Sequence, residues 1–312
     1  MSPAGGALPI RVLGEALMDC VAQPDGSLRP FMGGSPFNLA RAAALRGAHV
    51  AYLNPLSTDL FGQQMHAQLA QDGVQLPGGQ SPQPTSLAVV QISDGQPSYG
   101  FYREGIADRD YSADSVLALL AAQAPGVLHT GSLLLVPPEH HKVLAVLRGA
   151  KALGWTLSVD VNLRPQLAPD LAAYVRAVLE VAALADWLKA SDEDLAVLGF
   201  GPVQRSKAAR IASQFTAHGA SRVALTFGAE GAWLQVDGQS AEQAAPAVTV
   251  VDTVGAGDTF WGNCLADWAL APAGAGDRVA STLHLAMQAA AINCTRAGCQ
   301  PPTGAELRRP RV

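Results

Sequence analysis

Short apolar runs alternate with longer amphipathic stretches through the second half of the chain. Short runs bounded by turn residues predict buried strands, and apolar residues three or four positions apart predict helices. From residue 112 the predicted order is helix 113–123, strand 127–130, helix 138–152, strand 156–161, helix 170–183, strand 187–190, helices 192–198 and 205–218, and strand 222–226. This alternation predicts a doubly wound α/β fold with a mostly parallel sheet covered on both faces.

The N-terminal third interrupts the alternation with two polar hairpins. The pattern predicts strands over 10–14 and 50–53, helices over 37–46 and 59–71, and hairpins over 15–32 and 87–104, the second with strands 87–93 and 99–103 around the turn Asp94-Gly95-Gln96-Pro97. Ser35 can cap the first helix, and Pro36 suits its first turn. We expect the hairpins to form a small β-sheet lid over a core of residues 1–14, 33–86 and 105–312.

The C-terminal part is expected to add further elements to the same core. Residues 233–236 and 248–251 have strand-like composition and are predicted to be antiparallel additions to the sheet. Two long helices, over 258–270 and 277–295, are predicted to close the fold.

Composition narrows the classes of partner. The chain has 312 residues, a net charge of −5 and a pI near 5.8, which disfavours binding to nucleic acid or to an anionic membrane. Neither a signal peptide nor a membrane span is expected in the sequence. Its four cysteines have no zinc-binding spacing and are expected to be free thiols in a reducing compartment; they are Cys20, Cys264, Cys294 and Cys299. We therefore expect a cytoplasmic protein.

The stretch from Val251 to Phe260 contains the most specific chemistry. An apolar approach leads into the turn Gly255-Ala256-Gly257, and a helix-compatible run follows. A helix start directs unpaired N–H groups and the positive end of its dipole at a ligand, so it favours anions and phosphate in particular. Asp258 lies inside this turn, either as a helix cap or as a base beside a phosphate.

Polar residues follow several of the predicted parallel strands. Because ligands bind beyond the carboxyl ends of such strands, these residues are expected to line one crevice. They are Asp160, Asn162 and Arg164 after one strand, Lys189 and Ser191 after the next, and Thr226, Gly228 and Gly231 after the third. A lysine, an arginine and an anion-binding helix start suit a nucleoside triphosphate. Ser191-Asp192-Glu193-Asp194 fits either a capping box or a magnesium or phosphate site.

Two other nucleotide motifs are absent from the sequence. None of the four lysines follows a glycine, so there is no P-loop. The Gly255-Ala256-Gly257 turn also lacks the third glycine of a dinucleotide fingerprint, and Asp258 would lie where a pyrophosphate binds. These differences argue against a P-loop enzyme and against binding of NAD.

Residues 252–260, Asp-Thr-Val-Gly-Ala-Gly-Asp-Thr-Phe, resemble the C-terminal signature of the ribokinase-like (PfkB) carbohydrate kinases. Residues 33–40, Gly-Gly-Ser-Pro-Phe-Asn-Leu-Ala, resemble the N-terminal signature of the same family. The resemblance covers nearly the whole chain and implies ATP-dependent phosphorylation of a sugar hydroxyl.

The resemblance also implies roles for individual residues. Asp258 would be the general base, and Gly255, Ala256 and Gly257 would offer N–H groups to the transferring phosphate, with Arg164 offsetting the developing charge. Sugar-contacting positions are Asp19, Gly33, Gly34 and Asn38, with Arg103 as a further candidate. Nucleotide-binding positions are Asn162, Lys189, Thr226, Gly228, Gly231, Gly257 and Asn293. Asp194 stands at the glutamate of the usual Asn-x-x-Glu that positions Mg²⁺, while Asp252 and Gly298 resemble a monovalent-cation (K⁺) site.

The substrate suggested by the resemblance is fructose, because Gly14-Glu15, Phe101-Tyr102-Arg103 and residues 160–165 are most similar to fructokinases. The alternatives are a 2-keto-3-deoxygluconate kinase, a ribokinase or a nucleoside kinase on the same fold. A non-catalytic sugar or nucleotide sensor is the alternative from another class. The apolar residues Phe31, Phe101 and Tyr102 are expected to be exposed on the lid strands and suggest a homodimer formed through the lid.

Overall fold

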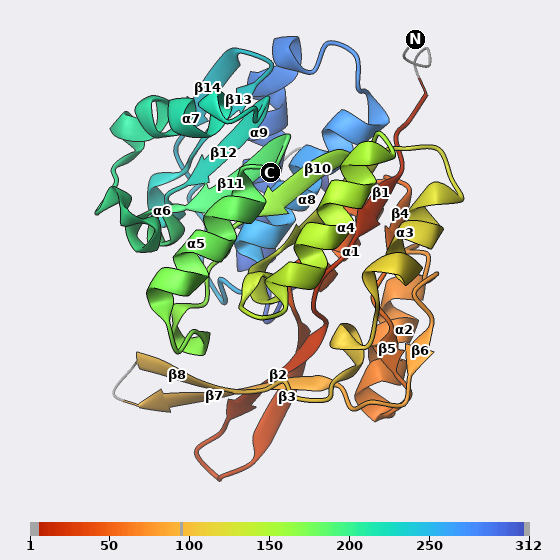
Figure 1. Ribbon diagram of the computed structural model, residues 1–312. Coiled ribbons are helices and arrows are strands. Elements are labelled where there is room, and N and C mark those ends of the chain that lie inside the picture. The colour runs from red at the N-terminus through yellow and green to blue at the C-terminus, as the bar shows by residue number, and fades with distance from the viewer. Residues whose placement is uncertain (1–5, 94–95, 309–312) are drawn as a thin grey trace.

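The computed structural model describes residues 6–93 and 96–308, and a large sheet runs through its centre (Figure 1). The strand order is β14-β13-β12-β11-β10-β9-β1-β4. Strands β4, β1, β9, β10, β11 and β12 pair in parallel, whereas β13 and β14 are antiparallel additions. Their bounds are β1 Ile10–Val12, β4 Val50–Tyr52, β9 Val127–Gly131, β10 Thr156–Asp160, β11 Trp187–Ser191, β12 Arg222–Thr226, β13 Ala232–Val236 and β14 Gln239–Gln243.

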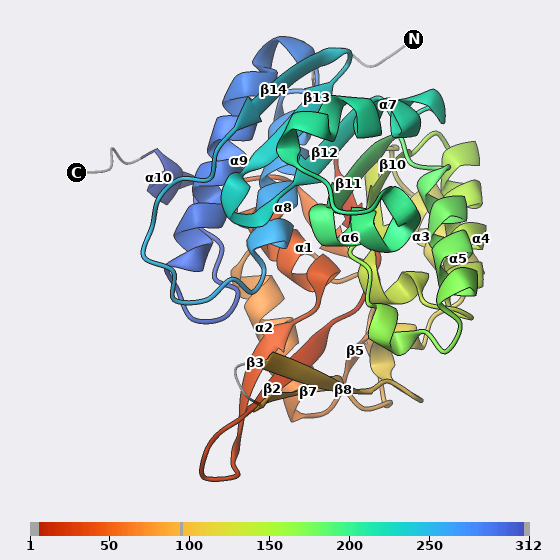
Figure 2. The ribbon, with the colours of Figure 1, turned by 90° about the vertical axis from the view of Figure 1, so that its left-hand side faces the viewer.

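Helices cover both faces of this sheet, as Figure 2 shows with the sheet between two helical layers. On one face, α3 (Ala113–Ala121), α4 (His140–Ala152), α5 (Leu171–Ala182) and α7 (Ala208–Ala217) pack on a core that includes Val143 and Val159. On the other, α1 (Ser35–Leu45), α2 (Leu60–Gln71), α8 (Ala256–Leu270) and α9 (Val279–Cys294) pack on a core that includes Phe37 and Trp261. The predicted doubly wound α/β fold is therefore confirmed.

A second, smaller sheet lies beyond the carboxyl end of β1, at the bottom of Figure 1. It contains β2 (Leu17–Ala22), β3 (Leu28–Gly33), β7 (Ser86–Ser93) and β8 (Gln96–Tyr102) in the order β3-β2-β7-β8. These strands come from the two predicted hairpins, and β2 pairs with β7 in parallel. Residues Asp94 and Gly95 of the predicted turn lie outside the described residues.

The remaining elements are short. Strands β5 (Leu56–Ser57) and β6 (Gln80–Ser81) pair with each other, and α6 (Asp192–Leu195) and α10 (Gly304–Leu307) are single turns. The predicted helix 192–198 is shorter than expected, because the chain passes from α6 into a π-helical turn, Ala196–Phe200. The 3₁₀ turns are Ala107–Arg109, Ser132–Leu135, Pro165–Leu167, Arg205–Lys207, Gly228–Glu230 and Gly276–Arg278. Within the described residues, no helix has the length and apolar character needed to cross a membrane.

The predicted strand over 248–251 is wrong. Val250 and Val251 face solvent, with Val251 62% exposed, and the Val251 N–H donates to the carbonyl of Cys294 rather than to a strand. The last strand of the sheet is β14 instead. Asp237 and Gly238 both have positive φ (49° and 87°) and form the tight hairpin turn that folds β14 back on β13.

The predicted cap of the first helix is also wrong. Helix α1 begins at Ser35, its N-cap is Gly34, and no side chain caps it. Gly34 has φ 104°, which a residue with a side chain rarely adopts, so the chain enters the helix from a glycine. The Ser35 hydroxyl is left free for another partner.

Candidate active site

Asp258 lies in the first turn of helix α8, directly after Gly255-Ala256-Gly257. Gly255 is the N-cap of this helix, with φ 71°, and a Cβ there would overlap the sulfur of Cys299. In the described part of the chain no acceptor receives the N–H groups of Gly257 and Asp258, whereas the Ala256 N–H donates to Thr253. The helix start therefore presents free amides beside a buried carboxylate, as anion binding requires.

The two signatures meet at Asp258. The Ser35 hydroxyl donates to Asp258 Oδ1 at 2.7 Å, and the Asn38 amide donates to Oδ2 at 2.9 Å. Burial raises the pKa of Asp258, and the hydrogen bonds from Ser35 and Asn38 oppose that shift without cancelling it. Asn38 Oδ1 is buried and without a partner among the described residues, so an acceptor remains for a ligand hydroxyl.

Lys189 lies under the same helix start. Its Nζ contacts both oxygens of Asp160, at 2.8 and 3.0 Å, and both side chains are almost fully buried. A Cβ built on Gly257 would lie 3.3 Å from Lys189 Nζ, so the ammonium group is next to the glycine turn. Burial lowers the pKa of Lys189, but the charges of Asp160 and Asp194 outweigh it and the net shift is upward. Lys189 therefore carries a positive charge below the candidate anion site.

Asp19, at the centre of β2, brings the small sheet to this site. Its carboxylate occupies the space that a Cβ on Gly33 would fill, which explains the glycine there. Burial raises the pKa of Asp19 to about 6, opposed by Arg164 and reinforced by Asp258. Arg164 folds back onto its own loop, where it donates to Asn162 Oδ1 at 2.6 Å. These charges act on each other, so the structure brings both residues toward Asp258.

Arg103 leaves β8 at the junction between the small sheet and the core. Its Nη1 approaches the carbonyl of Leu133 at 3.4 Å, while Nε and Nη2 are buried without partners among the described residues. Two carboxylates lie near it, those of Glu15 and Asp108, and Arg103 lowers the pKa of both. Burial outweighs that effect, so the pKa of Glu15 is raised and that of Asp108 reaches about 7.

Three of the predicted nucleotide positions lie at or after the end of β12, and another lies on α9. Thr226 ends β12, and Gly228 and Gly231 follow it with positive φ. Asn293, on α9, is fully buried; its amide donates to the carbonyl of Val254 and its Oδ1 accepts from Gln300. Asn293 thus joins the loop before α8 to the chain after α9, and its role toward a nucleotide stays a prediction.

The candidate metal ligands already have partners. Asp194 forms a capping box with Ser191 and accepts backbone N–H groups on both oxygens, from Leu163 at 2.6 Å and Ser191 at 2.8 Å. Asp252 accepts from Val254 and from Gly298, the latter at 2.8 Å. No group of three His, Cys, Asp or Glu side chains suited to a metal occurs in the described residues. Asp194 stays the predicted magnesium position, and Asp252 the predicted monovalent-cation position.

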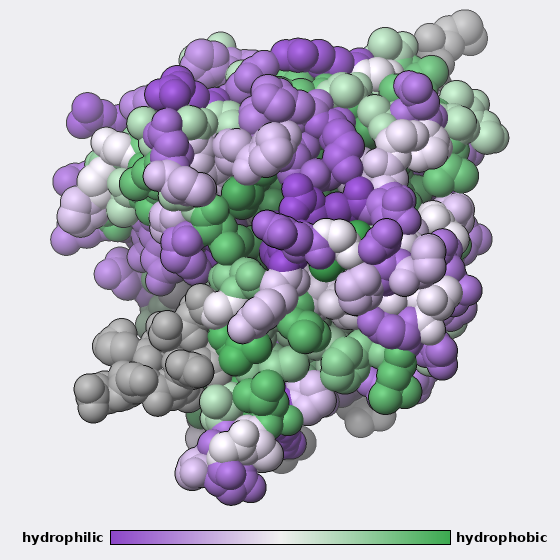
Figure 3. Space-filling model, turned by 60° about the horizontal axis from the view of Figure 1, so that its bottom comes forward, coloured by the Kyte–Doolittle hydropathy of each residue, from purple (hydrophilic) through white to green (hydrophobic). Residues whose placement is uncertain are grey.

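The small sheet also contacts the C-terminal part of the core. The expected exposure of Phe31 and Phe101 is wrong, because both side chains are partly buried and the ring of Phe31 packs over Gly298. On the same sheet Leu28 and Tyr102 are 50% and 64% exposed. Figure 3 brings this end of the molecule forward and shows apolar side chains gathered there.

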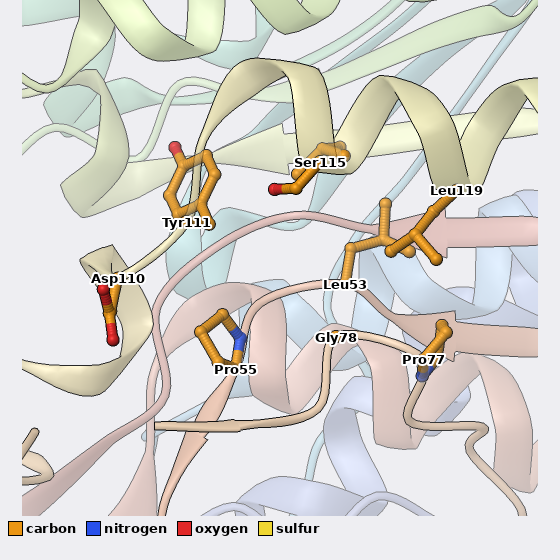
Figure 4. Close-up of a pocket in the computed structure, with 9 residues that line it drawn as sticks. Leu53, Pro55, Pro77, Gly78, Asp110, Tyr111, Ser115 and Leu119 are labelled. Atoms are coloured by element: carbon orange, nitrogen blue, oxygen red, sulfur yellow. The ribbon is translucent and has the colours of Figure 1, made fainter. Parts of the chain in front are cut away.

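A separate pocket of about 340 Å³ lies between α3 and the loops around Leu53 and Pro77 (Figure 4). Asp110, Tyr111 and Ser115 supply its polar groups. None of the predicted site residues lines it, so it does not belong to the candidate active site.

Sequence reasoning missed Ser35, Glu15 and Asp108 as parts of this site, and it placed Asp160 at the crevice without assigning its partner. Ser35 lies inside the N-terminal signature, and that position could have suggested a role in the site. Asp160 was recognised as a residue at a strand end, but its pairing with Lys189 depends on the register of β10 and β11. Nothing in the sequence indicates that Asp108 is buried.

Known proteins resemble this chain over most of its length. The sequence pattern of the pfkB family carbohydrate kinases matches residues 9–305. A fructokinase from Rhizobium leguminosarum bv. trifolii is 32% identical over 81% of this chain and 77% of its own length. The structure of a fructokinase from Xylella fastidiosa with bound ATP has 27% identity, a TM-score of 0.82 and 96% coverage of both chains. A Vibrio cholerae fructokinase in its fructose, ADP and calcium ion bound form has 25% identity, a TM-score of 0.83, and coverage of 96% of this chain and 98% of its own.

The fold and the glycine turn with its buried carboxylate define a sugar kinase of the ribokinase-like class. This chain belongs to the pfkB family of carbohydrate kinases. It is therefore a phosphotransferase, as the resemblance implied, and relatives of known structure bind ATP or ADP.

Proposed function

We propose that this protein is a fructokinase, which transfers the γ-phosphoryl group of ATP to a hydroxyl of fructose. The observation that carries the proposal is the carboxylate of Asp258, buried at a helix start with free amides and held by Ser35 and Asn38. Relatives of about 30% identity that are named fructokinases support the choice of sugar.

In the proposed reaction Asp258 takes the proton of the sugar hydroxyl. The hydroxyl oxygen forms a bond to the γ-phosphorus as the bond from that phosphorus to the β,γ-bridging oxygen breaks. ADP leaves with the electron pair of the broken bond, and Asp258 later releases its proton to water. The raised pKa of Asp258 suits this role, because a base of higher pKa accepts a proton more readily.

Developing negative charge would be offset by the chain itself. The N–H groups of Gly257 and Asp258 would donate to the transferring phosphoryl group, with the charges of Lys189 and Arg164 nearby. Magnesium would supply charge neutralisation at the phosphates, and Asp194, whose oxygens each accept one backbone N–H, would contribute through water.

The test is a coupled ADP-release assay over a panel of sugars and nucleosides, run with wild type and Asp258→Asn. Fructose should give the highest kcat/KM. Loss of a general base lowers turnover roughly a hundredfold to ten-thousandfold, so Asp258→Asn should lower kcat by that factor with little change in KM. Turnover near wild type in Asp258→Asn would refute the proposed mechanism, and a nucleoside as the best substrate would refute the proposed sugar.

A second candidate substrate is 2-keto-3-deoxygluconate. Arg103 has two buried nitrogens without partners among the described residues, and the carboxylate of an acidic sugar could pair with them. Glu15 and Asp108 beside Arg103 oppose extra negative charge, which favours the neutral fructose. The same panel separates the two, and sugar binding without turnover would indicate a sensor.

Three further features belong to the proposal. The small sheet, residues 15–32 and 87–104, would close over the sugar as a lid and exclude water. Asp252 and Gly298 would border a K⁺ site, tested by replacing K⁺ with tetramethylammonium in the assay. Leu28 and Tyr102 would lie in a homodimer interface through the small sheet, tested by light scattering; a monomer at micromolar concentration would exclude it.

A further inference from the structure

The Ser35 side chain is directed at the proposed base rather than at its own helix. Its hydroxyl donates to Asp258 Oδ1 at 2.7 Å across a separation of 223 positions in the chain. Ser35 is buried, and in the described residues its hydroxyl has no other hydrogen-bond partner. Ser35 follows the N-cap Gly34, so its hydroxyl is not used to cap its own helix and is available to Asp258.

Ser35 is itself fixed in place. Its backbone N–H donates to Glu15 Oε1 at 3.1 Å, and the carboxylate of Glu15 is buried at the first turn of α1. The next residue is Pro36, and its ring lies so close to Gly14 that a Cβ added to Gly14 would overlap the ring. The hydroxyl therefore has little freedom to move away from Asp258.

The two donors to Asp258 differ in what else they can do. Asn38 has a buried acceptor without a partner and lies at a predicted sugar position, so it can turn toward a substrate hydroxyl. Ser35 has no such second role. Asn38 can accept from a sugar hydroxyl through its Oδ1 while its amide still donates to Asp258, and Asp258 Oδ2 keeps a lone pair for a proton while Asp258 Oδ1 remains bonded to Ser35.

We propose that Ser35 is a positioning residue, which holds the Asp258 carboxylate so that Oδ2 faces the incoming hydroxyl. This inference rests on the proposed function, in which Asp258 is the general base. It assigns to the N-terminal signature a role in orienting the base as well as in binding the sugar.

Ser35 also influences the ionisation of the base. A donated hydrogen bond stabilises the charged carboxylate, so losing it should raise the pKa of Asp258 further. The other groups that act on Asp258 or feel its charge stay the same in a Ser35 variant. They are Lys189 and Arg164, which are positive, and Asp19, Asp160 and Cys299.

The test uses three variants of the full chain. Ser35→Ala removes the hydroxyl, Ser35→Cys keeps its volume but donates weakly, and Ser35→Thr keeps the hydroxyl. From the strength of a hydrogen bond to a charged group, Ser35→Ala should lower kcat about tenfold to a hundredfold with little change in KM. The acidic limb of its kcat/KM profile should move to higher pH. Ser35→Cys should resemble Ser35→Ala, and Ser35→Thr should retain most of the activity.

A double-mutant cycle separates positioning from packing. If Ser35 acts through the base, Ser35→Ala should have no further effect on kcat in an Asp258→Asn background. The same fold loss in both backgrounds, or an unmoved acidic limb, would overturn the inference. Failure of the proposed function looks different, because Asp258→Asn alone would then turn over like wild type.

Discussion

The ion pair between Lys189 and Asp160 offers a direct test of how charge is held beneath the glycine turn. The lysine nitrogen contacts both carboxylate oxygens, and the side chains are 5% and 1% exposed. Lys189→Met keeps the length of the side chain but leaves Asp160 buried without its counter-ion. Asp194 and Asp258 add negative charge nearby, so the uncompensated site is especially unfavourable.

Removing one partner of a buried ion pair costs about 3 to 5 kcal/mol. That is a large share of the roughly 5 to 15 kcal/mol by which folded proteins are stable. Removing both charges leaves neither Lys189 nor Asp160 as an unpaired ion, so the double variant Lys189→Met/Asp160→Asn should lie within about 2 kcal/mol of wild type. The losses of stability in the two single variants should therefore sum to more than the loss in the double variant.

Equilibrium unfolding in urea, followed by tryptophan fluorescence, measures these free energies. Arg148→Met is the matched control, because it breaks an ion pair whose side chains are 61% and 50% exposed and whose contribution should not exceed about 1 kcal/mol. A loss in Lys189→Met no greater than in this control would refute the argument. The folded double variant should still have a lower kcat, because it lacks the positive charge beside Gly257.

Two further predictions concern the glycine turn and the junction with the small sheet. Gly255→Ala should destabilise the fold by about 2 to 5 kcal/mol, since it adds left-handed strain and an overlap with Cys299. Gly73→Ala is the control, because Gly73 also has positive φ but open space around it, and it should lose only about 1 to 2 kcal/mol in the same urea assay. Equal losses in the two variants would contradict the overlap with Cys299. Asp108 has a pKa of about 7 in the native state, raised from about 3.9 in the unfolded chain. Its stabilising effect is thus complete below about pH 4 and is lost as the pH rises through about 7, with a slope of at most about 1.4 kcal/mol per pH unit. Unfolding of Asp108→Asn at pH 5 and pH 8 should show a smaller loss on raising the pH than wild type, and identical losses would contradict the burial argument.

The overall fold could be predicted because it depends on patterns repeated along the chain. The alternation of apolar strands and amphipathic helices fixes the layers, and the two glycine-containing signatures mark the ends of the site. These features depend on residues near one another in sequence. The same local reasoning finds neither a P-loop nor a dinucleotide fingerprint in the sequence.

The edge of the sheet could not be predicted in the same way. Residues 248–251 are rich in valine and have high β propensity, yet they lie in an exposed loop. Residues 239–243 are mostly polar but form β14, because the turn at Asp237 and Gly238 places them beside β13. Pairing with a neighbour decides an edge strand more than its own composition does.

Polar residues of similar type differ in how many of their side-chain atoms still lack a hydrogen-bond partner, and this difference decides which of them can bind a ligand. Asp194 and Asn293 are buried, and each of their polar side-chain atoms already bonds to a backbone group, which holds these side chains against the loops that they join. Asn38 and Arg103 are in the opposite state, with buried polar atoms that lack partners in the described residues. A ligand hydroxyl can form a hydrogen bond with either side chain without displacing a bond within the protein. The sequence shows which polar residues follow the strands, but only the structure separates those that hold the loops together from those still available to a substrate.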